Sequence, residues 1–140
     1  MTLKVSHNNT PAYDYVSEDG AMTNPIVRSI TIDKTGGEVT SDSIQVYLVA
    51  TDEGEGDIGG YRDIVVSPST AQAGLTWEIS LDNISFGPSA EPADMDVESA
   101  DDIVSVYVRV KGDNEPSSVL VTNNYAGEIK THAVERPPVI

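Results

Sequence analysis

Strict alternation between apolar and polar residues is the feature of this chain that most narrows its possible folds. It is clearest in residues 75–81, where Leu75, Trp77, Ile79 and Leu81 fall on one side. Residues 44–50 repeat the pattern with Ile44, Val46, Leu48 and Ala50, and residues 103–111 repeat it with Val104, Val106, Val108 and Val110. A period of two residues is the geometry of a β-strand with one buried face. These segments therefore predict half-buried strands, and no segment shows a sustained helical period; at most one helical turn fits residues 71–74.

Shorter apolar runs complete the predicted set of strands. They are residues 26–32, 64–66, 119–121 and 128–134, with a short edge strand at residues 3–5. Turn-forming residues separate them at 33–37, 111–116 and 123–127, and we interpret the last two as hairpin turns. Seven or eight short strands with regular turns favour an all-β fold, a β-sandwich of antiparallel strands. A small barrel is the alternative that this pattern leaves open.

The two flanks differ from the middle of the chain. We expect an N-terminal arm over residues 1–25, a β-sandwich domain over 26–134 and a Pro-rich tail over 135–140. Pro137 and Pro138 lack the N–H that a central strand needs. Both flanks fit arms that become ordered on a neighbouring subunit, and ordinary frayed termini are the alternative.

Charge and the lack of cysteine exclude several classes of protein. The chain has 140 residues, 8 of them Lys or Arg and 23 Asp or Glu, which gives a net charge of −15. Nucleic acid is not an expected partner, because phosphate binding needs clustered basic residues. With no cysteine, neither a disulfide nor a cysteine-based metal site can form. No apolar run approaches the roughly 18 residues of a membrane helix, and the first residues do not resemble a signal peptide, so we expect a soluble protein made in the cytoplasm.

Two acidic clusters are the strongest candidates for metal chemistry. One loop carries Asp52, Glu53, Glu55 and Asp57, and a second cluster comprises Glu91, Asp94, Asp96, Glu98, Asp101 and Asp102. Calcium prefers flexible loops rich in oxygen ligands, but the spacing of the first loop does not match the EF-hand pattern. We therefore favour solvated loops that keep the protein soluble and block edge-to-edge pairing of sheets. No metal or cofactor is expected.

Catalysis has little support in the sequence. His7 and His132 lie at opposite ends of the chain, and the Gly-x-Ser-x-Gly, Walker and His-Glu-x-x-His motifs are absent. A pair of carboxylates can hydrolyse glycosides, but among 23 acids some pair always looks suitable. Trp77 occupies an apolar position of a strand, which favours a core residue over a sugar-stacking platform. We expect a protein that is not an enzyme.

Aromatic residues outside the apolar positions indicate an interaction surface. Tyr47, Tyr107 and Tyr61 are predicted on or near outer faces, with Arg109 close by, and Tyr13 and Tyr15 lie in the N-terminal segment. Tyr and Arg are enriched at protein interfaces, although Tyr also forms routine cross-strand pairs. Our candidate interface residues are Tyr13, Tyr15, Tyr47, Tyr107 and Arg109.

Residues 77–86 read Trp-Glu-Ile-Ser-Leu-Asp-Asn-Ile-Ser-Phe. This segment resembles a hairpin of immunoglobulin-like domains, Trp-x-x-Ser-x-Asp-Gly-x-x-[Trp/Phe], in which the chain turns tightly and returns with an aromatic residue. Asn83 stands where Gly is common, and Asn tolerates the positive φ of such a turn. Residues 106–110 resemble the penultimate strand of these domains, so the likeness covers about the second half of the chain.

Such domains occur in tailed-phage virion proteins and in bacterial surface proteins. The resemblance implies an immunoglobulin-like β-sandwich and a non-enzymatic virion structural protein, first of all a capsid decoration protein that binds repeated capsid subunits. A phage tail or neck protein is the alternative, and a bacterial surface or secreted module that binds glycans, with or without calcium, is another. The implied partner is the major capsid or tail protein of the same virion, with a homo-oligomer such as a trimer as a further option. The implied location is the virion, with neither membrane nor nucleic acid as a partner.

Overall fold

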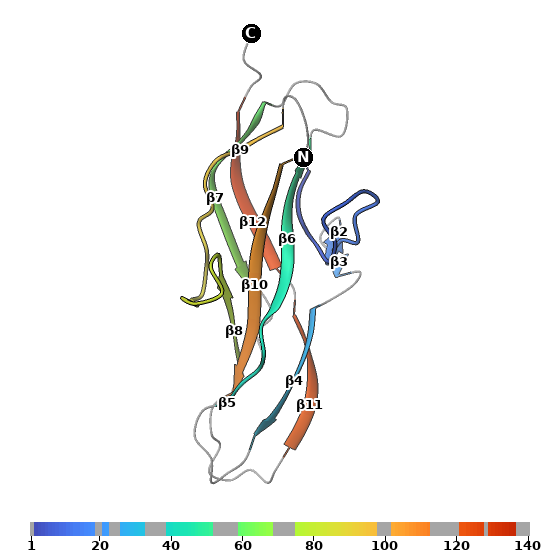
Figure 1. The fold of residues 1–140 in the computed structure, drawn as a ribbon, viewed down its shortest axis with the longest axis vertical. Coiled ribbons are helices and arrows are strands. Elements are labelled where there is room, and N and C mark those ends of the chain that lie inside the picture. The colour runs from blue at the N-terminus through green and yellow to red at the C-terminus, as the bar shows by residue number, and fades with distance from the viewer. Residues whose placement is uncertain are drawn as a thin grey trace.

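The computed structural model describes residues 2–18, 21–22, 26–32, 39–51, 59–68, 75–97, 102–112, 121–127 and 129–136. All regular secondary structure in these residues is β-strand, as the alternation predicts. Eight of the strands have five residues or more, in agreement with the seven or eight predicted. The main strands run along the long axis of the molecule (Figure 1).

The first layer is a five-stranded antiparallel sheet. Its strands are β1 (Thr2–Ser6), β5 (Val39–Thr40), β6 (Ile44–Thr51), β8 (Leu75–Ser80) and β10 (Asp102–Gly112). The long strand β10 pairs with β6 on one edge and with β8 on the other, while β1 pairs with β6 at the margin of the sheet. The predicted edge strand at residues 3–5 is therefore confirmed.

Strands β5 and β6 together occupy one edge of β10, with a bulge between them. Lys111 pairs with both Thr40 of β5 and Thr76 of β8, so β5 must lie on the edge opposite β8. Four positions separate Thr40 from Ile44, but only three separate their partners Lys111 and Val108, so β5–β6 carries one extra residue. At the bulge, the Ser41 hydroxyl accepts a hydrogen bond of 3.0 Å from the Val110 amide.

The second layer contains two antiparallel groups of strands. One comprises β7 (Gly60–Pro68), β9 (Met95–Asp96) and β12 (Ile129–Arg136), and the other pairs β4 (Ile26–Ile32) with β11 (Val121–Gly127). Only one residue separates β11 from β12, so the β4–β11 pair continues the second layer lengthwise (Figure 1). A two-stranded piece, β2 (Ser17–Glu18) with β3 (Ala21–Met22), stands beside these layers.

The apolar core lies between the layers and contains the inward faces that the alternation predicts. Its buried members include Val46, Leu48, Trp77, Ile79, Val106, Val108 and Val110 from the first layer and Ile26, Tyr61, Ile64, Val66 and Ile129 from the second. Ile44 and Val104 are partly buried and pack against this core. The two-layer arrangement is a β-sandwich, which decides against the barrel alternative.

Both margins of the sandwich carry contacts between the two layers. On one margin, residues 87–97 cross from the first layer to the second, because Gly87 bridges to Ile79 of β8 and Ala90 bridges to Val66 of β7. On the other margin, the Thr131 hydroxyl of β12 donates a 2.9 Å hydrogen bond to the Leu3 carbonyl of β1. The chain thus covers sheet edges that would otherwise expose unpaired backbone groups.

The two predicted hairpins at 111–116 and 123–127 are wrong. Strand β11 runs through 121–127 and pairs with β4, whereas β12 pairs with β7, so the Asn- and Gly-containing segment is a strand and not a turn. Strand β10 pairs with β5, β6 and β8, and β11 belongs to the other layer. The turn predicted at 33–37, the helical turn at 71–74 and most of the 111–116 segment lie outside the described residues.

Three smaller expectations also differ from the structure. Leu81 is 40% exposed because β8 ends at Ser80 and the chain turns away. Tyr61, expected near an outer face, is fully buried and its hydroxyl donates a 3.2 Å hydrogen bond to the Thr51 carbonyl. Strand β12 continues to Arg136, two residues into the segment expected as a tail, while residues 137–140 lie outside the described part.

Asp63 sits at a bulge in β7 and has a left-handed backbone, with φ of 52°. Val65 pairs with His132 and Arg62 with Val134, so Asp63 and Ile64 together oppose Ala133. Asp tolerates this conformation better than most residues. Both Arg62 and Asp63 are exposed, and burial resumes at Ile64, so Tyr61 and Ile64 face the core from either side of the bulge.

We predict that Leu48→Ala lowers the free energy of unfolding by about 2–5 kcal/mol, because Leu48 is fully buried and the substitution leaves a cavity. Urea unfolding followed by Trp77 fluorescence measures this, since Trp77 is the single tryptophan and is only 4% exposed. Thr76→Ala, at an exposed position of β8, is the control and should change stability by less than about 0.5 kcal/mol. Equal effects of the two substitutions would contradict the assigned strand faces.

Candidate docking face

Strand register brings three of the predicted interface residues into neighbouring rows on the outer side of the five-stranded sheet. In one row Tyr15 bridges to Ser6, Ser6 pairs with Tyr47, and Tyr47 pairs with Ser105. Directly opposed residues of a sheet point to the same side. Because the neighbours of Tyr47 in β6, Val46 and Leu48, are fully buried in the core, this row faces outward.

A second outward row lies beside the first. Gln45 of β6 pairs with Tyr107 of β10, and Tyr107 pairs with Ser80 of β8. The Gln45 side-chain amide donates a 2.9 Å hydrogen bond to the Ser105 hydroxyl, which links the two rows. Tyr47 and Tyr107 are both half-buried, so each ring is partly covered by its neighbours and partly open to solvent.

Arg109, the fourth predicted interface residue, lies in the next outward row and is held by its own chain. Its Nε donates to Glu78 Oε1 at 3.1 Å, and its guanidinium carbon lies 4.0 Å from the centre of the Phe86 ring. Glu78 is directly opposite Arg109 in the β8–β10 pairing. The guanidinium is therefore positioned between an acid and an aromatic ring, with its charge balanced by Glu78.

Tyr13 and Tyr15 form an aromatic pair beside β1. Their ring centres are 5.9 Å apart with the planes tilted by 35°, and Lys4 Nζ lies 5.0 Å from the centre of the Tyr15 ring. The backbone of the following residue ties this segment to the sheet, since the Val16 amide donates to the Val5 carbonyl at 2.8 Å. Val16 itself is fully buried. The described part of the predicted N-terminal arm is thus folded against its own sandwich.

Asn8 organises this N-terminal loop, a role that the sequence patterns did not predict. Its side-chain oxygen accepts hydrogen bonds from the Ser6 hydroxyl at 2.6 Å and from the Asp14 amide at 2.7 Å. Its side-chain nitrogen donates to the carbonyls of Thr10 and Ala12, at 3.1 and 2.9 Å. A Ser-x-Asn sequence after a strand is the available signal, because Asn commonly satisfies the backbone of a nearby loop.

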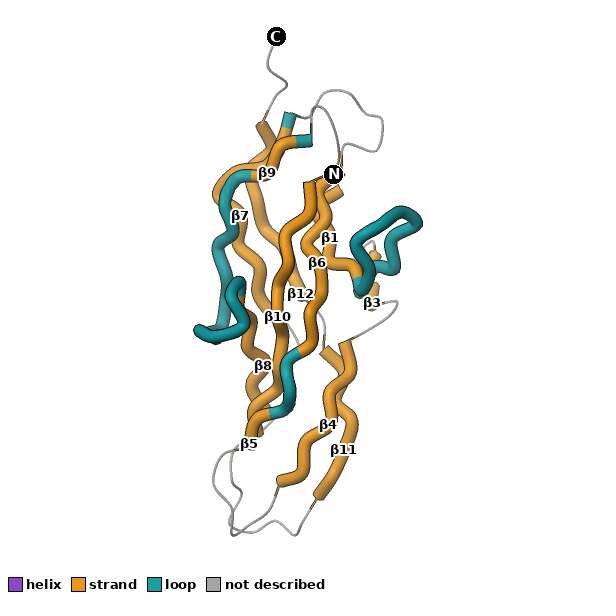
Figure 2. Tube along the Cα trace, in the orientation of Figure 1, coloured by secondary structure: helices purple, strands orange, loops and turns teal. Residues whose placement is uncertain are grey.

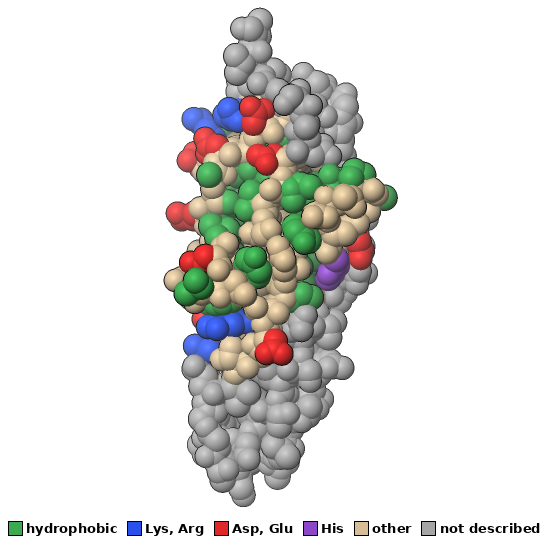
Figure 3. All heavy atoms as spheres, in the orientation of Figure 1, with side chains coloured by type: hydrophobic (Ala, Val, Ile, Leu, Met, Phe, Trp, Pro, Cys, Tyr) green, Lys and Arg blue, Asp and Glu red, His purple; other side chains and the backbone are tan. Residues whose placement is uncertain are grey.

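We name as the tyrosine face the outward rows formed by Tyr15, Ser6, Tyr47, Ser105, Gln45, Tyr107, Ser80, Glu78 and Arg109. Within these rows Ser6 and Ser80 are buried, and the other residues are at least partly exposed. In β1, β6, β8 and β10, the outward positions include three basic residues, Lys4, Arg109 and Lys111, and one acid, Glu78. This balance is unusual in a chain with a net charge of −15. In Figure 3 the centre of this face is hydrophobic and uncharged polar, with Asp and Glu toward its margins.

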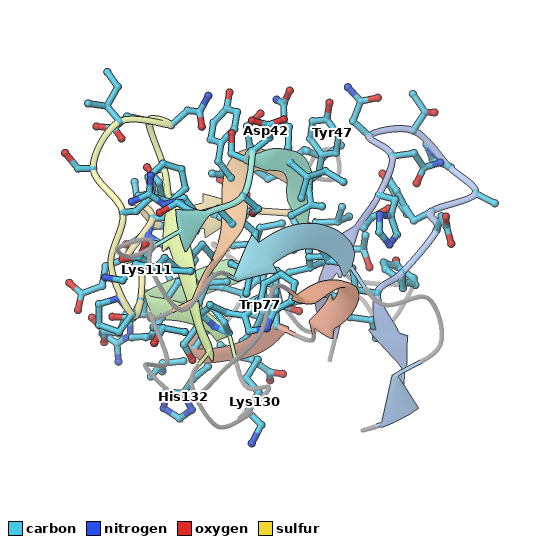
Figure 4. All side chains as sticks on the ribbon, turned by 90° about the horizontal axis from the view of Figure 1, so that it is seen from below. Asp42, Tyr47, Trp77, Lys111, Lys130 and His132 are labelled. Atoms are coloured by element: carbon cyan, nitrogen blue, oxygen red, sulfur yellow. The ribbon has the colours of Figure 1, made fainter. Side chains whose placement is uncertain are left out.

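The two outer sides of the sandwich differ in character. Figure 4 shows Tyr47 directed away from the layers on one side and His132 and Lys130 directed away on the opposite side, with Trp77 between them. His132 and Lys130 are exposed, as expected for the outer face of the last strand. The buried position of Trp77, at 4% exposure, confirms that it is a core residue.

The acidic clusters lie away from the tyrosine face or outside the described residues. The loop with Asp52, Glu53, Glu55 and Asp57 is in the undescribed segment 52–58. Of the second cluster, Glu91 and Asp94 join Asp63 around a hollow of about 350 Å³ beside β7. In the described ranges, no group of three His, Asp or Glu residues is arranged to hold a metal ion.

Asp82 fixes the turn at the end of β8. Its carboxylate accepts hydrogen bonds of 2.9 Å from the amides of Ile84 and Ser85 and one of 2.7 Å from the Ser80 hydroxyl. The Ser85 amide first, and then the Ser80 hydroxyl and the Ile84 amide, lower the pKa of Asp82 from 3.8 to about 2. Asn83 has the positive φ, 61°, that the turn was predicted to need.

No family model, no curated protein and no solved structure matches this chain. Within the residues that the structure describes, no helix has the length and apolarity to cross a membrane.

We predict that the turn at Asp82 stays ordered down to about pH 4 and loosens as the pH falls toward 2. The folded-state pKa is lowered, so the stabilising contribution is fully present above the ordinary value of 3.8 and is lost as the carboxylate is protonated near pH 2. NMR titration of the Asp82 carboxyl carbon, with amide exchange at Ile84 and Ser85, measures both effects. In Asp82→Asn this pH dependence should vanish; a titration near pH 4 in the parent chain would contradict the assigned hydrogen bonds.

Proposed function

We propose that this chain is a non-enzymatic protein-binding module that docks through the tyrosine face. The observation that carries the proposal is the gathering of Tyr15, Tyr47, Tyr107 and Arg109 on one side of the first layer, in a nearly neutral surface of a strongly acidic chain. Tyr and Arg are enriched at interface cores, where charged residues other than Arg are depleted.

The rigidity of this surface supports the proposal. Its side chains stand on a paired sheet, and two hydrogen bonds already hold four of them: Gln45 donates to Ser105, and Arg109 donates to Glu78. A surface whose side chains are ordered before binding loses less conformational entropy on docking. Tyr adds large contact area with few rotatable bonds, and its hydroxyl can pair with polar groups of a partner.

The setting that we propose is the virion of a tailed phage, with the chain as a capsid decoration protein bound to repeated capsid subunits. The support for this setting is the resemblance of residues 77–86 to the hairpin of immunoglobulin-like domains found in virion proteins. At the position where this motif commonly has Gly, Asn83 has a positive φ of 61°, and the Asp82 carboxylate accepts hydrogen bonds from the amides of Ile84 and Ser85. A tail or neck protein would use the same face. Binding to isolated capsids or to isolated tails therefore distinguishes the two roles.

Substitutions on the two outer sides of the sandwich test the docking surface. Tyr47→Glu combined with Tyr107→Glu places two charges on the tyrosine face, whereas Lys130→Glu combined with His132→Glu places two on the opposite side. We predict that co-sedimentation with purified phage particles falls at least about tenfold for the tyrosine pair, since each buried charge without a partner is costly, and changes little for the control pair.

The outcomes test the tyrosine face as the docking surface separately from the virion as its setting. If both pairs bind like the parent chain, or if only the control pair loses binding, the tyrosine face is not the docking surface. If the parent chain itself does not sediment with capsids or tails, the virion setting is wrong. Trp77 fluorescence verifies that each variant is folded, because its ring is enclosed in the core.

A further inference from the structure

The tip of the turn after β8 presents an isoleucine to solvent. Ile84 is 81% exposed, the most exposed of the large hydrophobic side chains in the described residues, and Leu81 beside it is 40% exposed. Figure 2 shows the loop that follows β8 projecting from the side of the sandwich. A single exposed apolar residue is ordinary on a protein surface, so the surroundings of Ile84 decide what it means.

The backbone that carries Ile84 is fixed. The Asp82 carboxylate holds the amides of Ile84 and Ser85, both at 2.9 Å. The Ser80 hydroxyl accepts a hydrogen bond of 3.0 Å from the Asn83 amide. Asn83 Oδ1 in turn accepts a 2.7 Å hydrogen bond from the hydroxyl of Ser43, in the segment before β6. The exposed side chain therefore stands on an ordered support, which is the property of a pre-organised binding anchor.

A hollow of about 240 Å³ lies on the same patch. It is lined by the apolar residues Ile79, Leu81 and Ala90 and by the polar residues Ser80, Asp82, Ser85 and Ser89. Its volume accommodates the branched four-carbon side chain of an isoleucine. Ile84 is adjacent in sequence to Ser85, one of the lining residues, so a protruding apolar group lies next to an opening large enough to take such a group.

Residues 79–90 form one of the surfaces on which two copies of the chain repel each other little. Residues 79–90 contain one ionisable side chain, Asp82, whereas the whole chain has 23 acidic and 8 basic residues. The Asp82 carboxylate is already surrounded by donors from its own turn. Two molecules with a net charge of −15 repel each other over most of their surface, and least where charged residues are few.

We propose that residues 79–90 form a two-fold contact with a second copy of this chain, in which Ile84 of each molecule enters the hollow of the other. A two-fold contact uses the same patch on both molecules and needs that patch to be self-complementary. The side-by-side protrusion and hollow meet that need. The contact goes beyond the proposed docking through the tyrosine face, because it involves the purified chain alone.

Sedimentation equilibrium of the purified chain tests the contact. We expect a concentration-dependent mass that rises from 14.9 kDa toward twice that value, and tighter association at higher salt because salt screens the repulsion between acidic molecules. Ile84→Asp removes the protrusion and Ser89→Trp fills the hollow, and each should weaken association at least about tenfold. Val134→Asp is the matched control, since Val134 is an exposed hydrophobic residue of β12, at 39%, away from this patch.

Mixing the two variants gives a sharper result. The Ser89→Trp molecule keeps its Ile84, and the Ile84→Asp molecule keeps its open hollow. A pair made of one of each therefore retains one intact insertion. The mixture should therefore associate more tightly than either variant alone. A monomer at all concentrations, an unchanged Ile84→Asp variant, an equal loss in Val134→Asp, or a trimer would each overturn the proposal. Because phage particles are absent from this assay, its outcome is independent of the proposed virion function.

Discussion

Strand β10 is hydrogen-bonded along both of its edges, and the rest of the molecule depends on that double pairing. Its inward residues Val106, Val108 and Val110 are buried in the core, while Ser105, Tyr107 and Arg109 point outward. Backbone ladders to β6 and β8 align those neighbours residue by residue. A shift of one residue in either ladder would exchange core and surface. The same register therefore builds the interior and assembles the tyrosine face.

Sequence patterns predicted the strands of this fold better than their pairing. The alternation at 44–50, 75–81 and 103–111 is local, and it placed the strands and their buried faces. Pairing of 26–32 with 121–127 joins segments that are distant in sequence, and no local pattern specifies it. Asn and Gly in 123–127 indicated a turn, yet partners across the sheet kept that segment extended, which is how tertiary context overrides intrinsic preference.

The candidate site was predictable where it depends on the alternation of inward and outward side chains along the strands. Tyr47, Tyr107 and Arg109 alternate with core residues, so their shared outer face follows once β6 and β10 pair. Tyr61 departs from the same rule because the extra residue at Asp63 shifts the alternation of β7 and turns Tyr61 inward, where its hydroxyl donates to the Thr51 carbonyl. The role of Asn8 depends on four hydrogen bonds of a loop whose shape the sequence does not encode as a repeating pattern.

The extra residue at Asp63 has a consequence for how this chain can vary. Tyr61 and Ile64 are three positions apart, a spacing that would put them on opposite faces of a regular strand, and the bulge lets both face the core. Deletion of Asp63 would leave Arg62 as the one outward residue between them, with Arg62 still opposite Val134 and Val65 still opposite His132. The inward residues of β7 would therefore keep their places, whereas deletion of any other single residue between Tyr61 and Val66 would leave the bulge and remove or displace a paired position. Homologous chains should tolerate the loss of this residue more readily than a deletion elsewhere in β7.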